Sequence, residues 1–465
     1  MRKGTSMCKK VCVLGLDCVP PDLVFGKWKN DLPILRRLME RGIYGPLEST
    51  VPPITIPAWT SMVTSKNPGR LGLYGMRNRQ DHSYEKMIFA NSLLVKEDTL
   101  WDILSRKGKK VALIGIPQTY PPKPVNGHMI TCFLTPDTNS NYTYPESLKA
   151  EIRSWVGEYL LDVDNFRTEE KDKLLEQIYE MTAKQFQVAL HLVREKGWDF
   201  FMMVVMGTDR IHHGFWRFHD PRHARYEPGS RYENAIRDYY INVDQRVGEL
   251  LSSIDSETTI LVVSDHGAKA MVGGVCVNEW LMQKGYLHLR EKPAGVVPFG
   301  KAMVDWNRTK AWGEGGYYSR IFLNVKGREP QGVIESSDYG PIREEIGEGL
   351  EAIADDQGVN IGTKVFKPEE VYSETRRIPP DLIVYFGNLS WRSVGSIGLG
   401  SVLTFENDTG PDDANHDTHG IFMMAGPNVR KAGRQEGMRI LDVAPTVLNL
   451  MDVEIPGDME GKVIQ

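Results

Sequence analysis

Residues 260–268 read Ile260-Leu261-Val262-Val263-Ser264-Asp265-His266-Gly267-Ala268, an apolar run that stops on a carboxylate and an imidazole. The first five residues have the apolar and β-branched composition of a short buried strand. In open α/β sheets, ligands bind at the carboxyl ends of the strands, so Asp265 and His266 stand where a metal ion could bind. The alternative is an aspartate that caps the next helix, followed by an incidental histidine.

Two other apolar runs also end on an aspartate. Residues 10–16 lead to Asp17, and residues 200–208 lead to Asp209. His213 follows Asp209 by four positions, so the two side chains can share one face of a helix. Near the C-terminus, Asp417-Thr418-His419-Gly420 precedes a further apolar run at 421–425. Together, these aspartates at strand ends and the histidines near them predict two adjacent metal sites on one sheet edge.

A threonine precedes a predicted helix start in the segment 49–60, where Thr55 stands two residues before Pro57. Because proline favours the first turn of a helix, Thr55 is expected at or just before the helix N-terminus. A hydroxyl there faces free backbone N–H groups and the positive end of the helix dipole, which suits a phosphate and favours the alkoxide. The alternative is an ordinary threonine N-cap.

Strand and helix patterns alternate along most of the chain. Helices are predicted at 32–39, 99–107, 171–194, 237–254 and 438–451, and strands at 11–16 and 111–116 and before Asp209 and Asp265. This alternation predicts an α/β fold, a mostly parallel sheet covered by helices on both faces. Residues 285–400 have a different sequence character, including a Gly-rich segment at 312–318, and are predicted to form an inserted cap. This leaves 1–284 and 401–465 as the core.

Composition narrows the class of protein. The 465 residues are 41% hydrophobic and 25% charged, with a net charge of −5 that offers no basic field for nucleic acid. The five cysteines form no Cys-x-x-Cys pair, which favours a reducing compartment and predicts a cytoplasmic protein. No apolar run reaches the ~18 residues of a membrane span, so we expect no membrane partner.

Taken in order, these motifs resemble those of the alkaline phosphatase superfamily, in particular its nucleotide pyrophosphatase/phosphodiesterase branch. That branch has a strand ending in Asp, a Thr-x-Pro with a nucleophilic threonine, an Asp-x-x-x-His, an Asp-His-Gly and a late His-Gly. The corresponding residues here are Asp17, Thr55-Ile56-Pro57, Asp209 to His213, Asp265-His266-Gly267 and His419-Gly420. The resemblance covers most of residues 10–280 and 415–465 and implies an alkaline-phosphatase-like core.

The resemblance also implies roles for individual residues. One metal ion would take Asp209, His213 and His419, and a second would take Asp17, Asp265, His266 and the Thr55 oxygen. Carboxylate and imidazole ligands suit Zn²⁺ best, with Mn²⁺ or Fe as alternatives. Thr55 would attack phosphorus to form a phospho-threonine that water hydrolyses, and the Asn78 amide would hold a phosphoryl oxygen. The alternative for Asn78 is a turn residue between two arginines.

The implied substrate is a small phosphate ester, with a phosphodiester or phosphonate monoester favoured. Ile56 replaces the aromatic residue that nucleotide-hydrolysing members carry after the threonine, which weakens the expectation of a nucleotide. Arg70, Arg77 and Arg79 crowd the following loop, and one of them reaching the site would favour a dianionic monoester instead.

Several alternatives stay open at this level. His416 competes with His419 as a ligand, and His212 is expected outside the ligand set because it points about 100° away from His213 on a helix. The segment Trp312 to Arg320 forms either a substrate pocket or a structural hairpin. Other readings are a phosphomonoesterase, a cofactor-independent phosphoglycerate mutase, whose nucleophile is serine, and a metal-stabilised binding protein without turnover. A sulfatase is disfavoured because the Cys-x-Pro-x-Arg context is missing.

Overall fold

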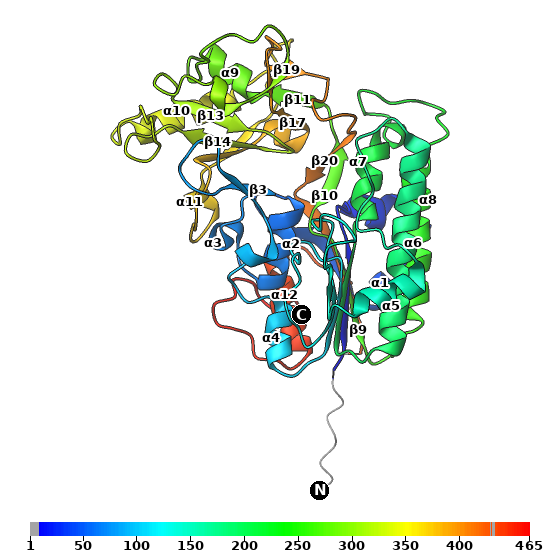
Figure 1. Cartoon of the computed structure of the whole chain (residues 1–465). Coiled ribbons are helices and arrows are strands. Elements are labelled where there is room, and N and C mark those ends of the chain that lie inside the picture. The colour runs from blue at the N-terminus through cyan, green and yellow to red at the C-terminus, as the bar shows by residue number, and fades with distance from the viewer. Residues whose placement is uncertain (1–8, 428, 430–432) are drawn as a thin grey trace.

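The computed structural model describes residues 9–427, 429 and 433–465, which form a large α/β core with a second lobe above it (Figure 1). The centre of the core is a ten-stranded sheet in the order β22-β2-β21-β9-β1-β8-β5-β6-β7, with β23 beside β2. Its strands are β1 (Val11–Leu16), β2 (Ile43–Glu48), β5 (Val111–Ile114), β6 (Gly127–Ile130), β7 (Thr143–Tyr144), β8 (Phe200–Val205), β9 (Thr259–Val263), β21 (His419–Ala425), β22 (Gly433–Arg434) and β23 (Met438–Arg439).

The strands in the middle of this sheet are parallel, and so are the short pairings of β2 with β22 and β23. β9, β1, β8, β5 and β6 run parallel, whereas β21 pairs antiparallel with both β9 and β2. The central strands β1 and β8 are short and buried at every residue, as expected for strands covered on both faces. The predicted fold class is therefore confirmed.

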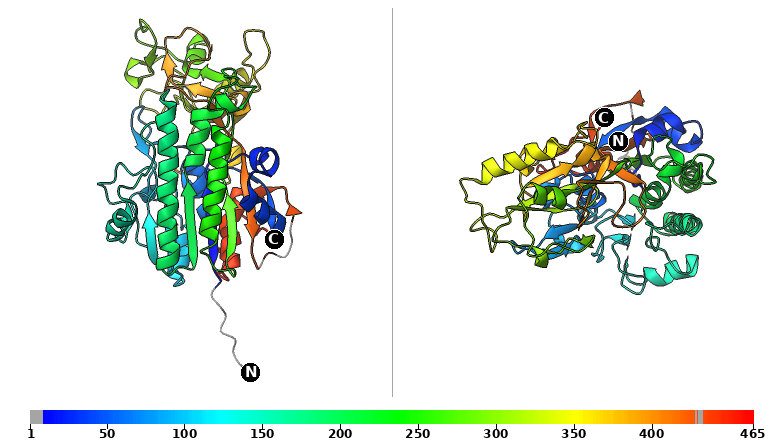
Figure 2. Two further views of the ribbon diagram at one scale, coloured as in Figure 1. Left: turned by 90° about the vertical axis from the view of Figure 1, so that its right-hand side faces the viewer. Right: turned by 90° about the horizontal axis from the view of Figure 1, so that it is seen from above.

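Alternate residues of each central strand enter the apolar cores on opposite faces of the sheet. In β1, Cys12, Leu14 and Leu16 face one core, and Val11 and Val13 face the other. Figures 1 and 2 show long helices over the first face. The helices of that face are α1 (Pro33–Arg41), α5 (Leu148–Val156), α6 (Lys171–Glu195), α7 (Gly207–His219) and α8 (Ala235–Leu251), and those of the other are α2 (Thr55–Thr64), α4 (Leu100–Arg106) and α12 (Val443–Leu450).

The second lobe has an apolar core of its own. A four-stranded sheet, β13-β14-β16-β15, lies beside a three-stranded sheet, β17-β11-β19. Its elements are β11 (Gly273–Cys276), α9 (Val277–Gln283), β13 (Ala311–Glu314), β14 (Ser319–Leu323), α10 (Tyr339–Glu351), β15 (Lys364–Phe366), β16 (Leu382–Tyr385), β17 (Trp391–Val394) and β19 (Leu403–Thr404).

This lobe begins earlier than the predicted boundary at residue 285. Val275, Val277 and Leu281 are buried in its core, so β11 and α9 belong to it. The predicted helix at 438–451 is also shorter, because β23 and a 3₁₀ turn at Ile440–Asp442 precede α12. In the part of the chain that the structure describes, no helix combines the length and apolar character needed to cross a bilayer.

Candidate metal centre and nucleophile

The three predicted aspartates meet at one edge of the sheet. β1 lies between β8 and β9, and all three strands run in the same direction, so the residues that follow them converge. Asp17 follows β1, Asp265 follows β9, and Asp209 lies in the first turn of α7, directly after β8. Each of the three is at most 2% exposed. The edge therefore holds a buried cluster of carboxylates.

Each carboxylate has one oxygen held by a donor and one oxygen that receives no hydrogen bond. The free oxygens are Asp17 Oδ1, Asp209 Oδ1 and Asp265 Oδ2, all of them buried. The donors to the other oxygens are Trp59 Nε1 to Asp17 at 2.7 Å, the Cys18 backbone N–H to Asp265 at 3.2 Å, and Arg210 Nη1 to Asp209 at 2.5 Å. Buried polar atoms normally find partners, so three such oxygens in one place fit a binding site for divalent cations.

The electrostatics agree with this interpretation. Burial, followed by repulsion from Asp265 and Asp209, raises the pKa of Asp17 well above its usual range. Burial opposes charge on His213 and His266, but neighbouring carboxylates outweigh it and raise the pKa of each to about 9. Without a metal ion, protons have to neutralise this cluster, and divalent cations would do so instead.

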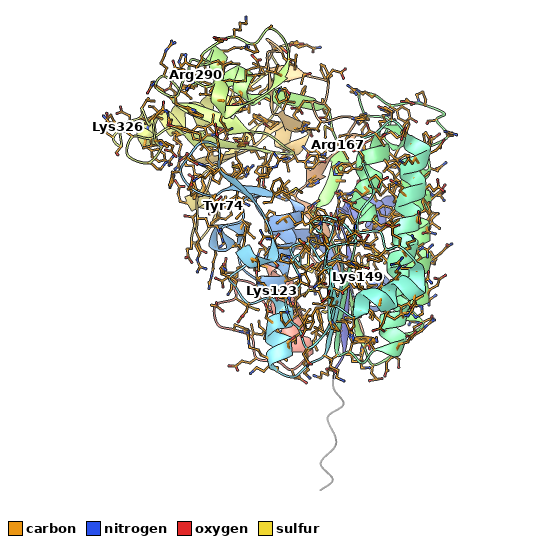
Figure 3. The ribbon with its side chains drawn as sticks, viewed as in Figure 1. Tyr74, Lys123, Lys149, Arg167, Arg290 and Lys326 are labelled. Carbon is orange, nitrogen blue, oxygen red and sulfur yellow. The ribbon has the colours of Figure 1, made fainter. Side chains whose placement is uncertain are left out.

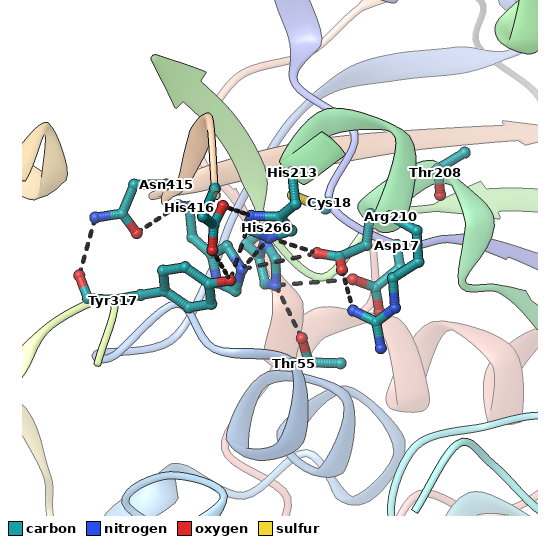
Figure 4. A network of polar contacts seen from close by, with 12 residues as sticks. Asp17, Cys18, Thr55, Thr208, Arg210, His213, His266, Tyr317, Asn415 and His416 are labelled. Atoms are coloured by element: carbon teal, nitrogen blue, oxygen red, sulfur yellow. Dashed lines mark hydrogen bonds and ion pairs between the residues drawn. The ribbon is translucent and has the colours of Figure 1, made fainter. Parts of the chain in front are cut away.

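Three imidazoles complete the cluster, and all three are anchored through Nδ1. His213 Nδ1 lies 2.7 Å from Asp412 Oδ1, His266 Nδ1 3.1 Å from the Gly267 carbonyl, and His416 Nδ1 3.0 Å from the Pro53 carbonyl. A proton on Nδ1 satisfies each contact and leaves the Nε2 lone pair free to bind a metal. Figure 4 shows these rings meeting between Tyr317 and Asp17.

One potential site consists of Asp209, His213 and His416. The His213 and His416 Nε2 atoms are 3.3 Å apart, and Asp209 Oδ1 lies 3.2 Å from the first and 3.7 Å from the second. Ligands about 2.0–2.1 Å from a tetrahedral Zn²⁺ are separated by ~3.3 Å, so this triangle matches one face of a zinc site. Cys18 Sγ belongs to the same group, in which all ligand atoms lie within 4.8 Å of one another.

The second potential site consists of Asp17, Asp265 and His266, with Thr55 beside it. His266 Nε2 lies 3.0 Å from Asp265 Oδ2, 3.9 Å from Asp17 Oδ1 and 3.3 Å from Thr55 Oγ1. Thr55 is the first residue of α2, as the position of Pro57 predicts. The N-cap is Ile54, and no side chain caps this helix, so the Thr55 hydroxyl is not used as an N-cap and faces the metal-binding cluster.

The structure corrects the expected role of His419, because this residue is exposed and lies at the start of β21 opposite Glu48. Its Nδ1 contacts Thr418 Oγ1 at 3.0 Å, whereas His416 is buried on β20 (Ala414–Asp417), which pairs with β10 (Gly267–Ala270). Gly420, which suggested a ligand motif, has a packing reason, since a Cβ there would collide with the Ser264 carbonyl. His416 therefore takes the place predicted for His419.

The structure also gives Asn78 a role in a turn. Its Nδ2 donates to the Gly75 carbonyl at 2.9 Å, and its Oδ1 accepts from the Tyr74 backbone N–H at 2.8 Å. Both ends of the amide thus bond to backbone groups, and none of the hydrogen bonds of the described residues joins Asn78 to Thr55.

The loop arginines are likewise engaged elsewhere. Arg70 pairs with Asp458 at 2.8 Å, Arg77 lies over the Phe89 ring, and Arg79 pairs with Glu329 at 3.1 Å. None of these contacts joins an arginine to Thr55, so they give no support to the alternative in which an arginine of this loop favours a dianionic monoester.

Three residues outside the predicted ligand set, Tyr317, Asp412 and Arg167, support His213, and of these only Tyr317 lies in a segment that sequence analysis considered for a substrate pocket. The Tyr317 ring, from the β13–β14 hairpin of the second lobe, stacks on His213 with 4.9 Å between centroids. The Tyr317 hydroxyl donates to Asp412 Oδ2 at 2.9 Å and accepts from Arg167 Nη2 at 2.6 Å. Figure 3 shows Arg167 where the two lobes meet. No spacing in the sequence links these segments, since only folding brings them together.

Comparison with known families identifies the class of protein. A family model described as type I phosphodiesterase / nucleotide pyrophosphatase matches residues 11–421. The chain belongs to this family. It is accordingly a phosphodiesterase-type hydrolase of a metal-dependent family, and the two ligand groups described above fit that chemistry.

Solved structures support the same fold for this phosphodiesterase family member. Human ectonucleotide pyrophosphatase / phosphodiesterase 5 has a TM-score of 0.55 at 14% identity, covering 98% of this chain and 97% of that one. The murine protein gives 0.54 at 13% identity, with 96% of each chain covered. An inactive murine variant in complex with AMP gives 0.55 at 13% identity and the same coverage. No curated protein sequence matches the chain.

Proposed function

We propose that this protein hydrolyses a singly charged phosphorus ester, a phosphodiester or a phosphonate monoester, through a phospho-threonine at Thr55. The observation that most directly supports this proposal is the position of the Thr55 hydroxyl. It lies 3.3 Å from His266 Nε2, at the first turn of a helix and beside the cluster of free carboxylate oxygens and imidazole nitrogens. This is the arrangement required of a nucleophile that works with two cations.

The residues that would hold the two ions fall into two groups. Asp209, His213 and His416 form one group, and Asp17, Asp265, His266 and the Thr55 oxygen form the other. Bound ions would supply charge stabilisation for the attacking oxygen, the phosphoryl group and the leaving oxygen. The mixture of imidazole and carboxylate donors favours Zn²⁺, with Mn²⁺ or Fe as alternatives.

In this proposed reaction, α2, Thr55 and Trp59 have distinct roles. The positive end of the α2 dipole lies at Thr55 and favours the deprotonated hydroxyl. The Thr55 oxygen then forms a bond to phosphorus while the bond from phosphorus to the ester oxygen breaks and the alcohol departs. In the second step, water attacks phosphorus, the bond to Thr55 breaks, and Thr55 regains its proton. Trp59 holds Asp17 throughout, through the 2.7 Å hydrogen bond from its indole.

Charge balance selects the class of ester. A dianionic monoester needs a third positive group close to Thr55, and the arginines of the following loop are engaged with Asp458, Glu329 and the Phe89 ring instead. Ile56, the residue after the nucleophile, is completely buried in an apolar cluster and is not available to stack on a base. These features support a singly charged ester without a requirement for a nucleotide base.

The test is a substrate panel with Zn²⁺ and then Mn²⁺. It comprises p-nitrophenyl monoester, bis(p-nitrophenyl) phosphate, a p-nitrophenyl phosphonate, p-nitrophenyl sulfate and a nucleotide p-nitrophenyl diester. We expect the diester or the phosphonate to have the highest kcat/KM. A preference for the monoester would support a phosphomonoesterase, and a preference for the sulfate would reject the proposal.

Two variants test the nucleophile directly. Thr55→Ala should abolish turnover but retain most of the metal, because Asp17, Asp265 and His266 remain. Thr55→Ser keeps the attacking atom and should retain part of the activity. After an acid quench during turnover, mass spectrometry should find a phosphoryl group on the peptide that contains Thr55. Turnover at the wild-type rate in Thr55→Ala would exclude the covalent route.

A further inference from the structure

Cys18 lies inside the candidate metal centre, directly after Asp17. It is completely buried, and its Sγ belongs to the group formed with Asp209, His213 and His416. Its Sγ lies 3.5 Å from the Gly267 carbonyl oxygen and also interacts with the Asp209 carboxylate. Figure 4 shows its sulfur close to the His213 ring.

The geometry of the group leaves a place for a fourth ligand. The Asp209, His213 and His416 atoms form a triangle with sides of 3.2, 3.3 and 3.7 Å. A tetrahedral ion seated on that triangle has one position left, which water, substrate or a further side chain can take. Cys18 Sγ lies within 4.8 Å of all three atoms. Zinc–sulfur bonds are about 2.3 Å long, and zinc can expand to five ligands, so a cysteine ligand still leaves a position for the ester. Asp209 Oδ1, which is buried and receives no hydrogen bond, independently indicates that an ion binds at this point.

The backbone holds the thiol in this place. Cys18 has φ of 64°, in the left-handed region where glycine is favoured and other residues are uncommon. Its backbone N–H donates to Asp265 Oδ1 at 3.2 Å, so the residue also touches the second ligand group. Among the described cysteines, Cys12, Cys132 and Cys276 are buried outside both ligand groups. Cys18 alone of these four has metal-binding neighbours.

We propose that the Cys18 thiolate is the fourth protein ligand of the ion held by Asp209, His213 and His416, and that this ion is thiophilic. The proposal rests on the proposed metal-dependent function. Binding forms a metal–sulfur bond and releases the thiol proton to solvent. One thiolate and one carboxylate then balance the charge of a divalent ion. Thiolate and imidazole favour Zn²⁺ or Co²⁺ over Mg²⁺ or Mn²⁺.

This ligand distinguishes the two sites from each other. The Asp17, Asp265 and His266 group is rich in oxygen and can accept a harder ion such as Mn²⁺. The two positions should therefore differ in metal preference, and the one that contains Cys18 should be the more selective for zinc.

Cobalt alone is the probe, because Co²⁺ is coloured and follows the zinc chemistry of such sites. The full-length protein is stripped of metal and titrated with Co²⁺, and its spectrum is followed from the near ultraviolet to the visible. Visible d–d bands report binding, and a thiolate-to-cobalt charge-transfer band in the near ultraviolet reports a sulfur ligand. We expect both in the wild-type protein, with the charge-transfer band assigned to one bound ion per chain.

Cysteine variants show which thiolate binds the cobalt ion. Cys18→Ser should lose the charge-transfer band and keep d–d bands, and its Zn²⁺ affinity should fall by at least the roughly 10- to 100-fold that loss of a supporting residue causes. Mn²⁺ binding at the other site should be little changed. Cys132→Ser, another buried thiol, is the matched control and should keep the band. If Cys18→Ser does not fold, a variant with Cys8, Cys12, Cys132 and Cys276 replaced by alanine should retain it.

The outcomes separate the two proposals. Visible bands without a charge-transfer band in the wild-type protein, or a band that persists in Cys18→Ser, would overturn the thiolate ligand and leave the proposed hydrolase intact. No visible bands at any Co²⁺ concentration would overturn the metal centre itself, and with it both the thiolate ligand and the proposed function.

Discussion

Replacing His416 with alanine removes one of the three atoms that define the Asp209 site. Nε2 of His416 lies 3.3 Å from Nε2 of His213 and 3.7 Å from Asp209 Oδ1, and the ring also stacks on His266 with 3.9 Å between centroids. The same change at His419 removes an exposed ring whose recorded side-chain contact is with Thr418. The two histidines are three positions apart, so His419→Ala is a closely matched control.

The magnitude follows from the role of the ligand. A bound metal supplies several kcal/mol of transition-state stabilisation, and losing ~4 kcal/mol lowers the rate by about 10³-fold. His416→Ala should therefore lower kcat/KM by about 10³-fold or more and reduce the metal content from about two ions per chain toward one. His419→Ala should change the free energy of unfolding by no more than about 0.5 kcal/mol and leave activity within roughly twofold of wild type.

The assay combines bis(p-nitrophenyl) phosphate hydrolysis with elemental analysis of the same metal-reconstituted samples. Circular dichroism and thermal unfolding establish that both variants fold. If His419→Ala loses metal and activity while His416→Ala retains both, the assignment drawn from the structure is wrong and the one drawn from the His-Gly motif is right. Loss in both variants would mean that the two residues contribute to one site.

Removal of the bound metal with a chelator should lower the free energy of unfolding, because the buried carboxylates lose their counter-ions. Zn²⁺ restored at 100 times its Kd should raise that free energy again by about 2.7 kcal/mol, which differential scanning calorimetry measures as a higher Tm. An unchanged Tm would contradict a metal site in the folded state. Tyr317→Phe keeps the ring stacking but removes the hydroxyl contacts to Asp412 and Arg167. The variant should fold normally, and its kcat/KM should fall roughly tenfold. An unchanged kcat/KM would show that the hydroxyl is dispensable. Burial raises the pKa of Asp413 to about 7, so the folded state holds a proton that the unfolded chain loses near pH 4. Wild-type stability should therefore fall by roughly 1–3 kcal/mol between about pH 4 and 7 relative to Asp413→Asn in denaturant titrations, and parallel pH profiles of the two proteins would contradict the buried proton.

Local sequence patterns predict much of the fold and part of the candidate metal centre. Short apolar runs that end on Asp17, Asp209 and Asp265 predict strands whose carboxyl ends share one sheet edge, and the structure brings all three together. This works because the direction of parallel strands fixes where their last residues lie. Helical spacing in the same way predicts that Asp209 and His213 share a face, and Pro57 predicts that Thr55 starts a helix.

Contacts between distant segments could not be predicted in this way. The choice of His416 over His419 depends on how β20 bends into β21, and the sequence motif indicated the wrong residue because Gly420 is required for packing against Ser264. The hydrogen bonds of the Asn78 amide to two backbone groups within its own turn likewise depend on the local fold of that loop. Both outcomes depend on the local path of the backbone.

The support behind His213 and the fourth donor at the metal centre have the same origin. Asp412, Tyr317 and Arg167 come from separate segments and meet when the second lobe packs on the core. Cys18 reaches the Asp209 group because its own backbone takes a left-handed turn directly after Asp17. Periodicity along a chain records which face a residue occupies, but it carries no information on which distant segment will cover that face. The residue types at each strand end were therefore predictable, whereas the partners of those residues were set by packing.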